Sequence, residues 1–253
     1  MRTQGQLITS PETLRALAQR IRMEVITLSH RAGTPHLGGS LSCVDILTAA
    51  YFSAMQLDPA HPDDPDSDRL VLSKGHAATS LYATLCERGL ISRELLSTYA
   101  EPGSRLAEHP GPRCAPGVEA GTGSLGHGLS LGVGMALAGR IQGRSYRTFV
   151  VLSDGECNEG SVWEAAMMAA AQRLDQLVAV IDFNKWQATG RSIEVFALEP
   201  LREKWAAFGW DACEVDGHDL TALAAALGKV PDGSGRPQAI IAHTVKGKGV
   251  SFM

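Results

Sequence analysis

The spacing of hydrophobic residues predicts a chain in which helices alternate with short buried strands. Across residues 10–33, apolar side chains recur every three or four positions, as on one buried face of a helix. Ser10 and Pro11 suit the start of this helix and Gly33 suits its end. Further helices are expected over residues 43–55, 77–88, 92–99, 129–141 and 160–174, and residues 205–212 and 220–227 extend the pattern.

Continuous apolar runs mark the expected strands, at residues 69–73, 146–152, 177–181 and 239–242. The second strand, the helix after it and the third strand make a βαβ crossover, in which the two strands run parallel. We therefore expect an α/β fold, with a doubly wound, mainly parallel sheet and helices on both faces. Residues 1–253 are expected to form a single domain that begins with a helical segment.

Glycine-rich segments separate these elements. Residues 36–42 are expected to form a loop, and residues 101–128 are dominated by Gly, Pro, Ser and Thr. A loop as long as the second one is uncommon inside a compact domain and is usually functional. Gly132, Gly134 and Gly139 lie within an expected helix, where glycine costs up to about 1 kcal/mol, so they predict close packing.

Composition narrows the class of protein. With 253 residues, 44% of them hydrophobic, the chain can bury roughly 70% of its unfolded surface without cross-links. The net charge of -4 and the absence of a Lys/Arg block argue against nucleic-acid binding. Five cysteines without a C-x-x-C pair favour a reducing cytoplasm over a disulfide framework or a zinc site. The N-terminal stretch lacks an apolar signal core, and no run approaches about 18 apolar residues, so no membrane is expected.

The two strands of the crossover end in residues that suit a metal ion. Asp154 follows the first strand and Asn184 follows the second, and parallel strands place their carboxyl ends at one edge of the sheet. Carboxylate and amide oxygens suit a hard cation such as Mg²⁺, which also takes phosphate oxygens and water. Gly155 permits close backbone approach, and the helix after it offers N–H groups to an anion. This pattern predicts a metal–diphosphate site; alternatively, Asp154 only caps the following helix.

Three histidines lie in separate loops ahead of this crossover, at His36, His76 and His109. A neutral imidazole can donate to phosphate or shuttle protons near pH 7. Any one loop histidine is more often solvated or structural, but three of them favour a shared pocket. The other histidines have weaker context (His30, His61, His218) or are undecided (His127, His243).

Residues 121–126 match G-x-G-x-x-G, the dinucleotide-binding fingerprint. That fingerprint needs a strand before it and an acidic residue about twenty positions later. Residues 114–120 contain Pro and Gly, and the positions near 145 carry no acid. Gly247 and Lys248 likewise lack the Ser or Thr that follows the lysine of a P-loop. A Rossmann dehydrogenase is therefore a weak alternative.

The chain resembles the thiamine-diphosphate (ThDP) domain of transketolases. The family motif is Gly-Asp-Gly, a spacer and then Asn, and Ser153, Asp154, Gly155 and Asn184 match it except at the first glycine. Other segments that resemble the family are SDGECNEGSVWEAAMMAA, DRLVLSKGHAATSLY, HPGPRCAPGVEAGTGSLGHGLSLGVGMA and the terminal VKGKGVSF. The resemblance covers nearly the whole chain.

The resemblance implies roles for the matching residues. Mg²⁺ (or Ca²⁺ or Mn²⁺) would be held by Asp154, Asn184 and the backbone carbonyl of Trp186. Contacts to ThDP would come from His76, Gly123, Ser124, Leu125, Gly155, Glu156 and Asn184.

The resemblance also implies the catalytic groups. These would be His36, His76 and His109, together with Glu159 in an acidic relay between paired cofactor sites. The alternative for Glu159 is an ordinary glutamate in the first turn of a helix. Pro35 and Leu37 depart from the family pattern, so that wall of the substrate site is expected to differ.

A full-length transketolase is much longer, and no segment of this chain resembles its pyrimidine-binding domain, which supplies an activating glutamate. We therefore expect the N-terminal subunit of a split transketolase, active only with a C-terminal partner subunit in a cytoplasmic α2β2 heterotetramer. It would transfer a two-carbon ketol (or acyl) unit from a small ketose donor to an aldehyde acceptor. The alternative is a non-catalytic scaffold or regulatory homologue, and the sequence leaves the donor and acceptor open.

Overall fold

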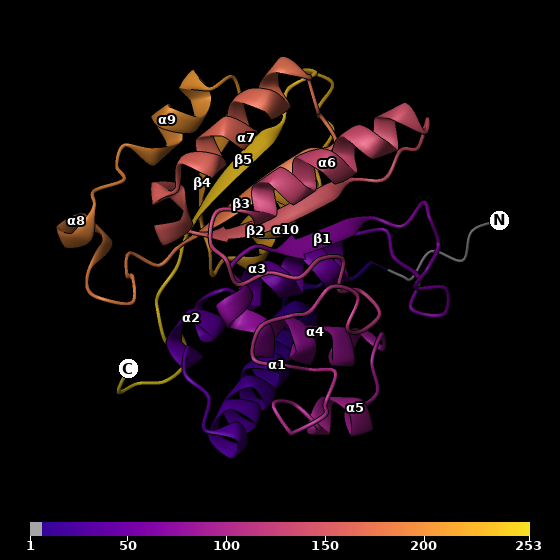
Figure 1. Ribbon diagram of the computed structural model, residues 1–253, viewed down its shortest axis with the longest axis vertical. Coiled ribbons are helices and arrows are strands. Elements are labelled where there is room, and N and C mark those ends of the chain that lie inside the picture. Colours follow the sequence, from indigo (N-terminus) through magenta and orange to yellow (C-terminus); the bar gives the residue numbers. More distant parts are fainter. Residues whose placement is uncertain (1–6) are drawn as a thin grey trace.

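Figure 1 shows the computed structural model, which describes residues 7–253. Residues 1–6, part of the stretch expected to lack a signal core, lie outside the described residues. Five strands form one sheet in the order β1-β2-β3-β5-β4, and every neighbouring pair is parallel. The strands are β1 (Arg69–Leu72), β2 (Thr148–Ser153), β3 (Leu177–Phe183), β4 (Asp211–Asp216) and β5 (Gln238–His243). The α/β class and the parallel crossover from β2 to β3 are confirmed.

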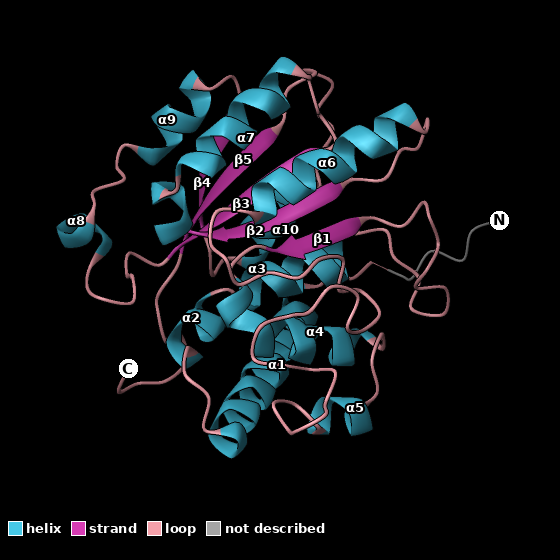
Figure 2. Ribbon diagram, in the orientation of Figure 1, coloured by secondary structure: helices cyan, strands magenta, loops and turns pink. Residues whose placement is uncertain are grey.

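Helices cover both faces of the sheet (Figure 2). One face carries α1 (Pro11–Ala32), α3 (Val44–Ala49), α4 (Ala78–Arg88) and α10 (Leu220–Leu227), and the other carries α6 (Gly128–Ile141), α7 (Gly160–Ala171) and α9 (Leu201–Ala207). Successive side chains of a strand point to opposite faces. Val151 accordingly packs in the first apolar cluster and Val150 in the second, so the sheet separates two hydrophobic cores.

The first helix begins and ends at the residues that the sequence predicts. The Ser10 hydroxyl accepts a hydrogen bond from the backbone N–H of Thr13 (3.3 Å), and Pro11 occupies the first helical position. Gly33 ends the helix with φ 63°, a left-handed conformation that glycine adopts without a Cβ penalty. The same start signal holds for α5 (Arg93–Ser97), which Ser92 caps.

Residues 36–42 do not form the expected loop, because Leu37–Ser42 is the short helix α2. Its glycines permit close contacts: a Cβ at Gly38 would lie 3.1 Å from Cγ of Lys246, and one at Gly39 would lie 3.6 Å from the His76 ring. Packing of this buried segment outweighs the low helix propensity of glycine. The helix expected over residues 43–55 is also divided, into α3 and the π-helical segment η1 (Ala50–Ala54).

Two further expectations are wrong in part. Residues 205–212 contain the end of α9 and the start of β4, an edge strand whose acidic, half-buried residues do not follow the hydrophobic pattern of a strand.

The glycines of α6 only partly mark close packing. A Cβ at Gly132 would meet Val150 Cγ2 at 2.3 Å, and one at Gly139 would meet the Tyr146 ring at 2.8 Å. Gly134 has nothing within 4 Å of that position, so it does not mark close packing.

Residues 101–127 contain no helix or strand, as expected, and lead into α6. The five cysteines are free thiols, which agrees with the absence of a disulfide framework. Among residues 7–253, none of the helices has the length and apolar character needed to span a membrane.

Candidate functional site

The carboxyl ends of β2 and β3 lie side by side. Ser153 of β2 is in register with Asp182 of β3, so Asp154 and Asn184 follow adjacent strands at one edge of the sheet, as expected. Asp154 is fully buried. Its Oδ1 accepts a hydrogen bond from the backbone N–H of Gly155 (3.0 Å), which caps the 3-10 helix η3 (Gly155–Asn158). Capping therefore accounts for only one of the two carboxylate oxygens.

The second oxygen of Asp154 binds the loop that follows β3. Oδ2 accepts hydrogen bonds from the backbone N–H of Lys185 (2.9 Å) and the hydroxyl of Ser192 (2.8 Å). Burial raises the pKa of Asp154, although the hydrogen bond from Ser192 opposes the shift. Within residues 7–253, Asp154 forms no ion pair. Because Oδ1 keeps an acceptor position and a buried carboxylate without a cation is costly, this position suits a metal ion.

Asn184 completes the expected pair of oxygen ligands. Its Oδ1 accepts a hydrogen bond from the backbone N–H of Trp186 (3.0 Å), and its Nδ2 donates to the Ser42 hydroxyl (3.3 Å). The described residues contain no cluster of three or more His, Cys, Asp or Glu side chains that could hold a metal. One carboxylate with an amide oxygen is a poor zinc site, but it fits Mg²⁺, which takes its remaining ligands from phosphate and water.

The three histidines converge beside this edge, although His76 lies in the 3-10 helix η2 (Gly75–Ala77) and not in the expected loop. The ring centroid of His36 lies 5.3 Å from that of His76 and 6.2 Å from that of His109. Burial, and then the positive charge of Lys74, lower the pKa of His76 to about 3. Burial also lowers the pKa of His36. His76 is thus a neutral imidazole near pH 7, able to donate through one nitrogen and accept through the other.

The glycine-rich segment 121–126 packs directly against the histidines. A Cβ at Gly75 would lie 2.5 Å from the carbonyl carbon of Thr122, so only glycine fits beside His76. Gly123 has φ 141°, and a Cβ there would meet the His109 ring at 2.9 Å. Ser124 and Leu125 follow in the same segment and are exposed; we call the exposed residues around the histidines the rim of the site. No strand lies immediately before residues 121–126, since residues 101–120 contain none, so this glycine pattern is not a dinucleotide-binding fingerprint.

Glu156 is buried, and its carboxylate binds three segments that form the site. Its Oε1 accepts hydrogen bonds from the Ser73 hydroxyl and the backbone N–H of Gly126 (3.0 Å). Its Oε2 accepts one from the backbone N–H of Ser153 (2.8 Å). The carboxylate therefore joins the ends of β1 and β2 to the glycine-rich segment, and a contact between Glu156 and ThDP stays a prediction.

Glu159 and Trp186 are exposed at the rim. Glu159 is the N-cap residue of α7 rather than a residue of its first turn, so the alternative interpretation of this glutamate is wrong in detail. Trp186 is 44% exposed and stacks against Arg191, with the guanidinium carbon 5.6 Å from the centroid of the ring. The relay and metal-binding roles of these two residues stay predictions.

Sequence reasoning missed a buried ion pair between Lys74 and Asp182, whose side chains are inaccessible to solvent. Lys74 Nζ also donates to the backbone carbonyl of Gly39 (2.9 Å). Asp182 further accepts hydrogen bonds from Ser42 (2.6 Å) and Thr244. The available signals were a lysine immediately after a buried strand and an aspartate inside the apolar run LVAVIDF.

The remaining histidines lie apart from the cluster or contact other side chains. His218 contacts the carboxylate of Asp45 (2.7 Å), His61 contacts that of Asp58 (3.0 Å), and His243 contacts that of Glu214 (2.9 Å). His127 lies 3.3 Å from the Ser124 hydroxyl, and His30 is exposed on α1. None of these five rings stacks with His36, His76 or His109.

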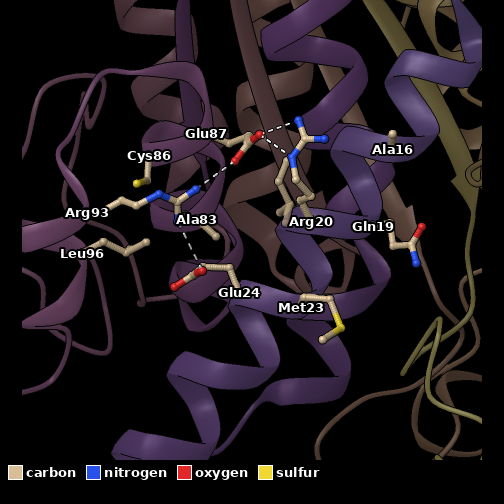
Figure 3. A pocket seen from close by; sticks show the side chains of 11 residues that line it. Ala16, Gln19, Arg20, Met23, Glu24, Ala83, Cys86, Glu87, Arg93 and Leu96 are labelled. Carbon is tan, nitrogen blue, oxygen red and sulfur yellow. Dashed lines mark hydrogen bonds and ion pairs between the residues drawn. The ribbon is translucent and has the colours of Figure 1, made fainter.

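A cavity of about 450 Å³ lies elsewhere, between α1, α4 and α5 (Figure 3). Its charged side chains neutralise one another: Arg20 pairs with Glu87 (2.6 Å), and Arg93 pairs with Glu87 (3.5 Å) and Glu24 (3.6 Å). The cavity contains none of the expected site residues. We therefore assign the functional site to the sheet edge rather than to this cavity.

Comparison with protein families gives a match to a model described as "Transketolase, thiamine diphosphate binding domain" over residues 13–252. The chain belongs to the transketolase family. It is 44% identical to an apulose-4-phosphate transketolase subunit of Phocaeicola vulgatus, over 96% of this chain and 86% of that protein. It is 45% identical to the 6-deoxy-6-sulfo-D-fructose transketolase subunit SqwG of a Clostridium species, over 88% and 81% of the two chains.

Solved transketolases share the fold. The Campylobacter jejuni transketolase superposes with a TM-score of 0.88 at 28% identity, over 95% of this chain and 39% of that one. A Pichia stipitis transketolase solved with sedoheptulose 7-phosphate gives a TM-score of 0.88 at 30% identity, over 96% and 37% of the two chains. This chain thus spans less than two fifths of the solved enzymes, and it corresponds to their ThDP-binding domain.

Proposed function

We propose that this chain is the ThDP-binding subunit of a split transketolase, which transfers a two-carbon ketol unit from a ketose to an aldehyde together with a partner subunit. The observation that carries the proposal is the buried Asp154 carboxylate, which forms no ion pair within residues 7–253 and lies beside Asn184 at the histidine-lined edge of the sheet. The relatives named as transketolase subunits support the same activity and the need for a partner.

Asp154, Asn184 and the backbone carbonyl of Trp186 would hold Mg²⁺, and the metal and Gly155 would bind the diphosphate. His76 would donate to the diphosphate, and residues 123–125 would lie along the cofactor. When bound, ThDP supplies the electron sink for the transfer of a two-carbon unit, while the protein supplies orientation and electrostatics. The tight packing of Gly75 against Thr122 keeps the imidazole of His76 and the glycine-rich segment in fixed relative positions.

His36 and His109 would face the substrate. Both residues are exposed, whereas His76 is half-buried, and partial burial lowers the pKa of His36, so His36 is mainly neutral near pH 7. Neutral imidazoles can accept a hydroxyl proton or donate to a carbonyl oxygen. These two side chains would therefore orient the hydroxyl groups of a ketose and carry protons during the transfer.

The partner subunit would cover the rim. Leu125 is 37% exposed and Trp186 is 44% exposed, and His109 and Glu159 are also open to solvent. Reactive intermediates in such a site need protection from water, which a second polypeptide would provide. Assembly of the whole chain as one domain of a cytoplasmic α2β2 heterotetramer, with Glu159 in a relay, stays a prediction.

We further propose a ketose donor that carries an anionic group. The two relatives are named for apulose-4-phosphate and for 6-deoxy-6-sulfo-D-fructose, and each name contains a sugar with an anionic substituent. Lys246 lies near the histidines: its Nζ donates to the backbone carbonyl of Gln187 (3.2 Å), and its positive charge adds to the effect of burial in lowering the pKa of His36, while Glu108 opposes the shift. The ammonium group of Lys246 would attract a phosphate or sulfonate group of the substrate.

Co-expression of this chain with the product of the neighbouring reading frame tests the proposal. The assembled protein should bind ThDP in the presence of Mg²⁺ by calorimetry and should cleave a ketose phosphate or sulfonate in the presence of an aldehyde. Asp154→Asn, which keeps the size of the side chain and one oxygen, should abolish both ThDP binding and ketose cleavage, with thermal unfolding as the check that the variant folds. An assembled, folded complex that binds no ThDP would favour the non-catalytic scaffold instead.

A further inference from the structure

A buried polar network joins helix α2 to Asn184. Lys74, Asp182 and Ser42 are fully inaccessible to solvent, and Asn184 is almost so. Lys74 is paired with Asp182, and Ser42 donates to Oδ2 of that carboxylate (2.6 Å). Asn184 Nδ2 in turn donates to the oxygen of Ser42 (3.3 Å). The network therefore runs from a buried cation to the side chain that is expected to bind the metal.

The direction of these hydrogen bonds determines the orientation of the Asn184 amide. The Ser42 hydroxyl has a single hydrogen, and this hydrogen goes to Asp182 or, at 3.0 Å, to the backbone carbonyl of Gly39. In both cases only an acceptor position of the Ser42 oxygen faces Asn184. That position favours the NH₂ group of the amide and disfavours its oxygen.

The orientation of the amide also fixes the position of its oxygen, Oδ1. With Nδ2 on Ser42, Oδ1 points to the side of the backbone N–H of Trp186 and keeps one acceptor position free. A flipped amide would present NH₂, which cannot bind a cation, where the oxygen is needed. Oriented outer ligands of this kind are known to adjust metal sites in proteins.

We propose that Ser42 is a positioning residue for Asn184, and that the Lys74–Asp182 pair holds Ser42 in place. The inference rests on the proposed function, because it assumes that Asn184 binds the metal. Lys74 pairs with Asp182, Asp182 accepts the hydroxyl hydrogen of Ser42, and the Ser42 oxygen then accepts from the Asn184 amide and fixes its orientation. Thr244 holds the second oxygen of Asp182 and completes the arrangement.

The test compares Mg²⁺ affinity among variants of the assembled complex at saturating ThDP, by calorimetric titration. Ser42→Ala should weaken Mg²⁺ binding about tenfold, the lower end of the range for residues that orient metal ligands. Ser80→Ala is the matched control: Ser80 is also fully buried, but its hydroxyl donates to the backbone carbonyl of Ala77 (2.6 Å) and does not reach Asn184. This control should retain the affinity of the unmodified complex.

A double-mutant cycle with Asn184→Asp separates positioning from a general structural role. A carboxylate presents an oxygen in either orientation, so Ser42→Ala should change Mg²⁺ affinity less than about twofold in the Asn184→Asp background. If Ser42→Ala does not fold, as judged by thermal unfolding, Ser42→Cys fills the space with a weaker acceptor and should also lose affinity.

Three results have distinct meanings. Equal Mg²⁺ affinities for Ser42→Ala and Ser80→Ala would overturn the positioning role. Equal losses from Ser42→Ala in the presence and absence of Asn184→Asp would overturn it as well, because the effect would not pass through the amide. An unmodified complex that binds neither Mg²⁺ nor ThDP would overturn the proposed function itself, and the inference with it.

Discussion

Replacement of Lys74 by Met should strongly destabilise the protein. Methionine keeps much of the length of the side chain, but it leaves the fully buried carboxylate of Asp182 without its cation. Removal of one partner from a buried ion pair costs about 3–5 kcal/mol. Ser42 and Thr244 still donate to Asp182, so we expect about 3 kcal/mol. For a chain of this size that loss lowers Tm by about 6–12 °C.

Urea unfolding followed by tryptophan fluorescence measures this loss, since Trp205 and Trp210 are fully buried. The matched variant combines Lys74→Met with Asp182→Asn, which removes both charges and keeps an oxygen for Thr244. Because no uncompensated charge remains, the double variant should be more stable than Lys74→Met alone. A loss below about 1 kcal/mol for Lys74→Met, or a double variant no more stable than the single one, would refute the reasoning.

Three further predictions concern packing, protons and metal. Gly132→Ala should lower the free energy of unfolding by about 1–3 kcal/mol, because its Cβ would lie 2.3 Å from Val150. Gly134→Ala should raise the free energy of unfolding by up to about 1 kcal/mol, because its Cβ meets nothing within 4 Å and alanine favours a helix. Equal shifts of Tm for the two variants would contradict this. The pKa of His76 is lowered to about 3 in the folded protein. Between about pH 3 and pH 6.5, the unfolded chain therefore binds a proton at His76 that the folded chain does not bind. The free energy of unfolding should therefore fall as the pH drops from about 6.5 to about 3, and His76→Asn should flatten that slope in urea titrations. Removal of the divalent cation with EDTA should lower Tm of the ThDP-loaded complex, and Asp154→Asn should abolish that metal dependence; a variant that keeps it would exclude Asp154 as a ligand.

The sequence predicts those features that arise from local patterns. The helix from Pro11 to Ala32 carries its own start and stop signals, and the β2–β3 crossover follows from two apolar runs around one helix. Because parallel strands share an edge, the positions of Asp154 and Asn184 follow from the crossover alone. The meeting of the three histidines is harder to predict, since it depends on how three loops fold back on the sheet.

Features that depend on distant partners are hidden in the sequence. Lys74 after β1 and Asp182 inside β3 are each visible as charged residues beside apolar runs, but nothing local pairs them, because the two strands lie far apart in the chain. The helix α2 contradicts the propensity of its glycines; residues 38–42 are buried, and Gly38 packs closely against Lys246. Likewise, β4 carries three acidic residues and is only half-buried, whereas the other edge strand, β1, is apolar and buried, so an apolar run identifies β1 but not β4.

The order of the strands in the sheet also determines when each part of the sheet can form during synthesis. β1 is synthesised first but pairs only with β2, and β5 must insert between β3 and β4, both of which precede it in the chain. Long-range parallel pairing of this kind is slow to form. On the ribosome, Lys74 therefore emerges long before Asp182, and Thr244 follows later still. The polar network at the functional edge is completed only after β5 has been synthesised, because Thr244, which follows β5, donates to Asp182.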